Sequence, residues 1–461
     1  MSEPAPAPSP HALNSFETWA PLLRLWADGA RAGGEDGTVR LAGAVGRDGW
    51  RSSSGVRPRG RASAAEQAAI ETVRDALVAA GAESVTFSAR VAPSRRTRLR
   101  VAGPSPAVEH GVSGGGALLL VEGAVPEPWR RLPDPAPDAR PARSADPAAL
   151  TRRLRERLPG AVGAGDEEIA AAEARLGRTL PDELTALYRV VRGRWEDWAG
   201  DAGTGDAVYE AVGCELLPLD DVYVADAASR PAPWRFAACE AAVTPPDAAV
   251  QHLVGSPGWI VFGDNGGGDR LAVDLTPGPA GRTGQIVLLS HEAYIGAEPV
   301  ADSLTDLVHG VRPRGRRYGR GEGPAVAHVN VAHLRSVEAA AHPELEVLSI
   351  GVWDGPPVDL TPVVGLPRLR TLTAYPGTLA DPRQIGLLTG LEYLEVGPDE
   401  WRALLDAGAV PRGLAAADIT THGLPDHGRL VDLSNEILAL WGRPPIVRTV
   451  IDGDLGPLPP A

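Results

Sequence analysis

The stretch GWIVFGDNGGGDRLAVDL, residues 258–275, decides the fold of the central part of the chain. Two apolar runs, Trp259–Phe262 and Leu271–Asp274, flank a glycine-rich segment, which is typical of two strands joined by a turn. Glycines supply the positive φ that a tight hairpin needs, and Asp264 and Asp269 are placed to close it. A phosphate cradle requires a helix after the glycines, and an EF-hand requires alternating ligands with a distal glutamate, so both alternatives are disfavoured.

Outward from this hairpin, the sequence predicts an α+β domain over residues 151–311. A third strand is expected at Gln285–Leu289, and a closing helix is expected to begin at Ser303. Two helices precede the strands, because Asp166 is a good cap for one and Pro181 opens the other. The predicted order is therefore two helices, a sheet and a helix.

These segments, in this order, resemble the SUKH family, which is named partly for fungal cell-wall regulators of the Smi/Knr type. The resemblance rests on residues 166–188, 216–222 and 258–275. One departure is Val191-Arg192-Gly193, where the family usually has Asn-Gly-Gly, and this puts a ligand role for that loop in doubt. The resemblance implies a binding module without catalysis. Many bacterial members resemble immunity proteins that neutralise a partner toxin, and fungal members act as regulatory scaffolds.

Residues 11–125 predict a second, small α+β domain that shows no family resemblance. A first helix is indicated by apolar residues at helical spacing, namely Phe16, Trp19, Leu23 and Trp26. Ser63 with Glu66 forms a capping box before a second helix, and strands are expected at 85–91, 99–101 and 118–121. Residues 111–115 match the G-x-S-x-G motif of hydrolases, but a strand rather than a helix follows, so a turn is expected.

Residues 326–461 contain a repeat. The pattern L-x-x-L-x-apolar begins at Leu345, Leu369, Leu391 and, in weakened form, Leu414. The steps of 24, 22 and 23 residues lie in the range of leucine-rich repeats, so the segment is predicted to be a short α/β solenoid. Residues between the leucines should face the concave side, where Tyr375, Tyr393 and Glu395 are candidate contacts for a protein partner. The alternative is that this surface of the strands binds no partner.

The predicted fold class is therefore α+β and multidomain, with an N-terminal α+β module, a central SUKH-like domain and a C-terminal leucine-rich-repeat solenoid. The Pro-rich residues 126–149 and the Arg/Gly-rich residues 312–325 are expected to be linkers. An RNA or acidic-surface contact is the alternative for the second linker.

The chain of 461 residues has a formal charge of −14, and all 45 of its basic residues are arginine. Residues 151–461 carry 27 arginines against 43 acids. An acidic chain is not a general nucleic-acid binder, whereas it suits a basic protein partner. Two isolated cysteines, Cys214 and Cys239, indicate neither a zinc site nor a disulfide framework. No apolar run is long enough to span a bilayer, so we expect a cytoplasmic protein without membrane, metal or cofactor.

A second candidate patch combines indole rings with acids, namely Trp195, Glu196, Asp197, Trp198 and Asp201. Such side chains can bind a basic partner protein. The alternative is that the two tryptophans are buried in the core. Asp264 and Asp269 are further acidic candidates. The first hypothesis is a non-catalytic, immunity-type protein that occludes a basic toxin. The alternatives are a regulatory scaffold without a toxin and an enzyme whose site lies in residues 11–125.

Overall fold

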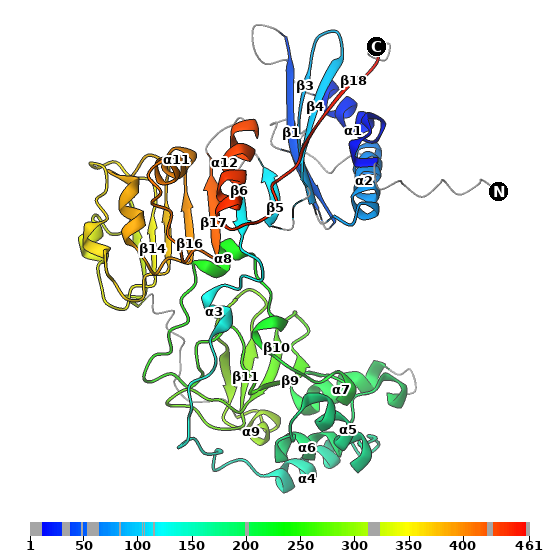
Figure 1. Ribbon diagram of the computed structural model, residues 1–461. Helices are drawn as coiled ribbons and strands as arrows, with labels where there is room; N and C mark the ends of the chain where they lie inside the picture. Colours follow the sequence, from blue (N-terminus) through cyan, green and yellow to red (C-terminus); the bar gives the residue numbers. More distant parts are fainter. Residues whose placement is uncertain are drawn as a thin grey trace, which may run out of the picture. The chain divides into compact units, whose positions relative to one another are not determined.

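The computed structural model divides the chain into two compact units (Figure 1). The central unit is Val125–Ala325, and the discontinuous unit combines Met1–Ala124 with Val326–Ala461. The structure describes residues 12–29, 37–47, 49–52, 64–82, 84–103, 105, 107–113, 116–198, 202–311, 323–421 and 427–457. Ser63 of the predicted capping box and residues 312–322 of the second predicted linker lie outside these ranges.

The central unit has one antiparallel sheet in the order β12-β11-β10-β9-β7, with β8 also paired to β9. Its strands are β7 (Glu215–Leu216), β8 (Tyr223–Val224), β9 (Trp259–Asp264), β10 (Arg270–Asp274), β11 (Gln285–Leu289) and β12 (Glu298–Ala301). Its helices are α3 (Glu127–Arg130), α4 (Pro147–Arg157), α5 (Asp166–Leu176), α6 (Asp182–Tyr188), α7 (Ala202–Val212), α8 (Trp234–Ala238) and α9 (Leu304–Val308). Short 3-10 turns are η2 (Trp195–Trp198), η3 (Leu219–Asp221) and η4 (Ala227–Ser229). The structure contains the three predicted strands, as β9, β10 and β11. It also contains the three predicted helices, as α5, α6 and α9.

The apolar runs of β9 and β10 supply both faces of this sheet. Ile260 and Phe262 pack into the cluster that contains α4 to α7 and α9, whereas Trp259 and Val261 pack into a second cluster. Alternate residues of a strand point to opposite faces, so a run without polar interruptions predicts a strand that is buried on both sides.

The Pro-rich residues 126–149 differ from the prediction of an extended linker. They contain α3, and the Trp129 indole donates a hydrogen bond to the carbonyl oxygen of Arg230 at 2.9 Å. Further along, the Asp134 amide donates to the side chain of Gln251 at 2.7 Å. The segment therefore packs on the central unit. Proline content alone could not show this, because the partners lie about a hundred residues away in the chain.

Asp274 at the end of β10 makes the stability of the central unit depend on pH. Its side chain is wholly buried, and burial raises its pKa to about 6 although Gln285 and Thr276 donate hydrogen bonds to it. A raised folded-state pKa gives a stabilising contribution below about pH 4, which is lost as pH rises through about 6. We expect about 3 kcal/mol of this stability to be lost by pH 7 in denaturant titrations. In D274N, the free energy of unfolding should change little between about pH 4 and pH 7. A wild-type free energy of unfolding that is constant over this range would contradict the prediction.

The discontinuous unit has two sheets. The first is antiparallel, in the order β18-β4-β3-β1-β2, with α1 and α2 on one face (Figure 1). Its elements are η1 (Ala12–Asn14), α1 (Phe16–Gly29), β1 (Val39–Gly46), β2 (Trp50–Ser52), α2 (Ala64–Ala79), β3 (Ser84–Val91), β4 (Arg96–Ala102) and β18 (Arg448–Asp454). The predicted apolar stripe of α1 is confirmed, since Trp19, Leu23 and Trp26 are buried against this sheet.

The second sheet has the order β13-β14-β15-β16-β17-β6-β5. The first five strands are parallel, namely β13 (Val326–Val329), β14 (Val347–Ile350), β15 (Thr371–Ala374), β16 (Tyr393–Val396) and β17 (Ala416–Thr420). The two others, β6 (Gly116–Leu120) and β5 (Val108–Ser113), are antiparallel to their neighbours. The connections include α10 (Val337–Ala340), η5 (Thr361–Val363), η6 (Pro382–Leu387), α11 (Pro398–Asp406) and α12 (His427–Leu440).

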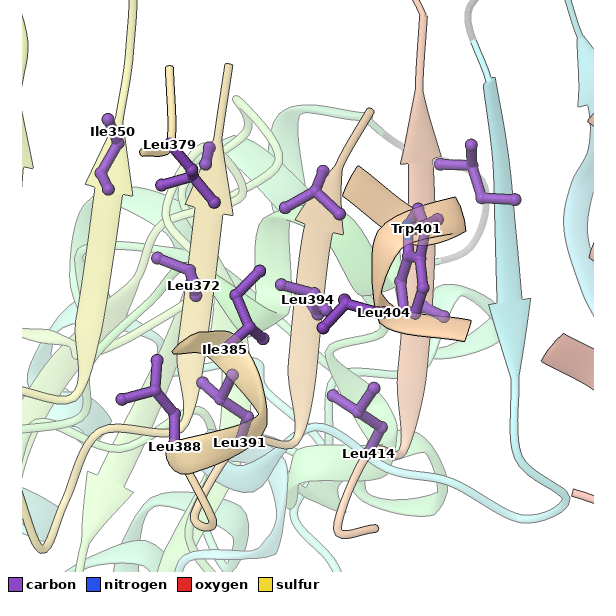
Figure 2. Close-up of a cluster of buried hydrophobic side chains, with 14 of the residues drawn as sticks. Ile350, Leu372, Leu379, Ile385, Leu388, Leu391, Leu394, Trp401, Leu404 and Leu414 are labelled. Carbon is purple, nitrogen blue, oxygen red and sulfur yellow. The ribbon is translucent and has the colours of Figure 1, made fainter. Parts of the chain in front are cut away.

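The repeated leucines lie in register along the parallel strands. Leu348 is opposite Leu372, and Leu372 is opposite Leu394. These side chains are buried with those of the intervening segments, such as Leu388 and Leu404 (Figure 2). Each copy of the leucine pattern therefore corresponds to one strand of this sheet.

Two strand pairings join the ends of the chain. β6 pairs with β17, and the C-terminal strand β18 pairs with β4 over seven residue pairs. Residues 11–125 and 326–461, which we predicted as separate domains, are thus parts of one unit. Local patterns do not encode which strand lies at a sheet edge, and so neither pairing was predicted. Ser113 ends β5 and pairs with Gly116 of β6, whereas Gly114 and Gly115, the last two residues of the G-x-S-x-G motif, lie outside the described residues.

Candidate protein-binding surface

A network of ion pairs holds the loop that precedes η2. Arg192 donates two hydrogen bonds to the Asp197 carboxylate, both at 2.7 Å, and a third to Glu168 at 3.0 Å. Arg194 binds Asp220 at 2.6 Å and lies 3.3 Å from Glu168. The network therefore ties α5, the loop, η2 and η3 together.

Hydrogen bonds and neighbouring arginines favour the ionised form of two carboxylates in this network, Asp197 and Glu168. The hydrogen bonds from Arg192 lower the pKa of Asp197 below its ordinary value. A hydrogen bond from the backbone N–H of Gly165 lowers the pKa of Glu168, and both arginines add to this effect. Asp197, one of the predicted partner contacts, is therefore already paired inside the domain. Arg192 and Arg194 are not among the predicted site residues, although two arginines close to acidic residues in the sequence are a signal for such pairing.

The side chain of Trp195 is 55% exposed, and Glu196 beside it is exposed. These two residues of η2 thus present an indole and a carboxylate at the surface, as the patch interpretation predicts rather than the core alternative. The side chain of Trp198 and the whole of Asp201 lie outside the described residues.

A groove of about 480 Å³ lies beside η2. It is lined by Arg157, Leu158, Pro159, Gly160, Ala161, Val162, Val191, Gly193, Asp197, Gly203, Thr204, Ala207 and Val208. Most of this lining is small or apolar, and Val162 is exposed. Gly193 adopts a φ of +76°, and a Cβ there would approach the Leu217 carbonyl oxygen to 2.9 Å. Asp197 of η2 lines this groove, and Trp195 is exposed on the same turn, so the η2 face suits a side chain or a short segment of another protein.

The β9–β10 turn uses Asp264 and Asp269 internally. Asp264 accepts a hydrogen bond from the Gly266 amide and forms an ion pair with Arg270. Asp269 accepts hydrogen bonds from the amide and ring of His291, and the amide bond is the main reason why its pKa is lowered. Gly266 has a positive φ of 80°. The hairpin prediction is confirmed, and these two carboxylates serve the turn.

In the parallel sheet, the predicted patch of Tyr375, Tyr393 and Glu395 is not a continuous exposed surface. Tyr375 is 39% exposed, whereas Tyr393 is wholly buried. The hydroxyl of Tyr393 hydrogen bonds to Asp418 at 3.1 Å and to Glu395 at 3.2 Å. The prediction that Tyr393 is exposed is wrong, because the pattern gives the side of the sheet on which a residue lies but not what covers it.

No group of three His, Cys, Asp or Glu side chains in the described ranges is arranged to hold a metal ion. Within the same ranges, no helix has the length and apolar character needed to cross a membrane.

Charge is concentrated in the part of the central unit that carries η2 and the hairpin. Residues 163–310 contain nine arginines and 24 Asp or Glu residues, which gives a formal charge of −15. Since the whole chain has a charge of −14, the rest of the chain is close to neutral. A surface of one sign attracts partners of the opposite sign and speeds their association.

Comparison with known proteins connects the same residues to a family. The model of the SMI1 / KNR4 family (SUKH-1) matches residues 163–310. The glucan synthesis regulatory protein of Neurospora crassa is 40% identical over 67 residues, which are 14% of this chain and 13% of that protein. The cell wall biosynthesis/cell cycle regulator smi1 of Schizosaccharomyces pombe has the same identity and coverage. A KNR4/SMI1 homolog of Yarrowia lipolytica is 43% identical over 62 residues, or 13% of this chain and 9% of that protein.

The chain thus spans only 9–13% of the length of these curated relatives. The matched residues contain the α5–α6 helices, the ion-pair network, η2 and the β9–β10 hairpin. Residues 163–310 are therefore a SMI1/KNR4 (SUKH-1) domain, as the resemblance of the sequence predicts.

Proposed function

We propose that this protein is a non-catalytic regulator that binds a basic protein partner through the η2 face of its SMI1/KNR4 domain. The observation that carries the proposal is an exposed indole, Trp195, on the same 3-10 turn as Asp197, which lines a groove, in a domain with a charge of −15. An aromatic anchor concentrates binding energy, and the acidic surround selects a basic partner. The names of the fungal relatives, which describe regulators of glucan synthesis and of the cell wall, support a regulatory role.

Neutralisation of a toxin is the second candidate, and the charge of the domain favours it. An acidic domain can occlude the basic surface of a nuclease or similar toxin by the same contacts, as immunity proteins of this family type do. The two candidates share one surface and differ in the identity of the partner.

The discontinuous unit would add to the contact surface. We propose that its parallel strands are a short, degenerate leucine-rich-repeat array, supported by the steps of 22 to 24 residues and by the leucines in register. The whole protein would act in the cytoplasm.

The test is capture of partners by the tagged full-length protein, with W195A as the variant. We expect W195A to weaken binding of the captured partner by roughly thirtyfold, the effect of losing about 2 kcal/mol at an aromatic anchor. F236A is a matched control, because Phe236 lies in the same unit and is 57% exposed. E196Q should slow association at low salt and leave dissociation nearly unchanged.

The identity of the partner separates the candidates. A cell-wall or signalling protein whose binding depends on Trp195 supports the regulator, and a toxin with the same dependence supports neutralisation. Equal binding by wild type, W195A and F236A would contradict the proposed surface.

A further inference from the structure

The described helices of the discontinuous unit cover only one face of its antiparallel sheet. Leu41, Phe87 and Leu99 point to α1 and α2, so the alternate residues of their strands point to the opposite face. At one end of that face Ala44 and Thr86 are buried, and β5 contacts β1 and β3. The other end is exposed and carries mostly arginine.

Three arginines lie directly opposite one another across three neighbouring strands. Arg40 of β1 is opposite Arg90 of β3, and Arg90 is opposite Arg98 of β4. All three residues are exposed. Side chains directly opposite each other in an antiparallel pair have Cβ atoms about 4.5–5.5 Å apart, and like charges at that distance destabilise the sheet. An arrangement that costs stability needs a reason outside the fold, because a neutral side chain in place of Arg40 or Arg90 would relieve the repulsion.

The fourth member of the row shows which ligand suits these arginines. Asp452 of β18 is opposite Arg98 and accepts two hydrogen bonds from its guanidinium, at 2.8 and 3.2 Å. This pairing lowers the pKa of Asp452 and keeps it ionised. The side chain that satisfies one arginine is thus a carboxylate on an extended strand. Among the described residues, Arg40 and Arg90 have no such carboxylate.

From this row we infer that the exposed face of the sheet binds an acidic, extended protein segment, with carboxylates on Arg40 and Arg90. Two observations favour a peptide over a nucleic acid. The described residues of β1, β3, β4 and β18 on this face include no aromatic side chain on which bases would stack. The chain as a whole has a charge of −14, which repels a long polyanion but tolerates a short acidic segment.

The surface is distinct from the η2 face, which lies in the other unit and suits a partner of the opposite charge. The inference therefore stands or falls independently of the proposed function.

The experiment measures binding of a short, fluorescein-labelled oligo-glutamate peptide to the full-length protein by anisotropy at low salt. We expect R40A/R90A to weaken binding roughly tenfold, since each exposed ion pair contributes modestly. R368A/R412A is the matched control, because both arginines are exposed in the same unit and the change in net charge is identical. D452A should tighten binding severalfold, because it releases Arg98 for the peptide.

A thermal melt of the same variants separates binding from folding. Since R40A/R90A relieves repulsion between like charges, its Tm should equal or exceed that of the wild type. A lower Tm with lost binding would assign the arginines a structural role and overturn the inference. An effect of the control pair as large as that of R40A/R90A, no binding of the peptide, or tighter binding of a DNA duplex with matched charge would each overturn it as well.

Discussion

Replacing Trp401 by alanine is expected to lower the free energy of unfolding of the discontinuous unit by about 4 kcal/mol. Its indole is wholly buried in the cluster behind the parallel strands, together with Leu394 and Leu404 (Figure 2). Its Nε1 donates a hydrogen bond to the carbonyl oxygen of Asp418 in β17 at 3.0 Å. Truncation therefore leaves a large cavity and also removes the partner of a buried carbonyl group.

Hydrogen exchange followed by mass spectrometry measures this effect in each unit separately. In W401A, amides of the β14–β17 strands should lose protection, whereas amides of β9–β11 in the central unit should keep theirs. W401F is the control, because it retains most of the ring volume and loses the hydrogen bond, and it should cost about 1–2 kcal/mol. Equal loss of protection in both units would contradict the division into two units.

Replacing Gly116 by alanine is the second substitution with a large expected effect, about 3 kcal/mol or more. Gly116 begins β6 with a φ of +127°, and a Cβ at this position would overlap the backbone carbonyl of Ile419 in β17. Since β6 and β17 are the strands that join the N-terminal and C-terminal parts of the sheet, the overlap would push the two parts of the unit apart.

G123A is the matched control for this substitution. Gly123 also has a positive φ, +67°, but a Cβ there would meet no atom within 4 Å. Its cost should be that of the left-handed backbone alone, about 1–2 kcal/mol. Urea titrations of both variants give the comparison, and a G116A that is no less stable than G123A would show that the β6–β17 pairing tolerates the side chain.

Much of the central domain could be predicted from its sequence because its signals are local. The apolar runs at Trp259–Phe262 and Leu271–Asp274, separated by glycines, specify a buried hairpin without reference to the rest of the chain. The leucine spacing similarly predicted where the strands of the parallel sheet lie, because one strand per copy follows from the period.

The candidate site could be predicted only in outline. Trp195 and Glu196 are exposed, in agreement with the patch interpretation. Asp197 is paired with Arg192, and Tyr393 is buried, and neither fact is contained in the residue types. A carboxylate can be exposed to solvent or paired with an arginine of the same protein. Which of the two applies depends on which loops lie next to each other, and that is a property of the tertiary structure.

The sequence by itself thus determined the features that depend only on residues close together in the chain. These are the hairpin, the amphipathic helix α1 and the positions of the repeated strands, together with the acidic charge of residues 163–310. Only the tertiary structure decided that β18 closes the sheet of the N-terminal part, that β6 extends the parallel sheet, and that Arg40, Arg90 and Arg98 form one row. The physical reason is that strand pairing in this row joins residues from 8 to 354 positions apart through backbone hydrogen bonds, which are the same for every sequence. Side-chain patterns therefore identify a strand but not its neighbour.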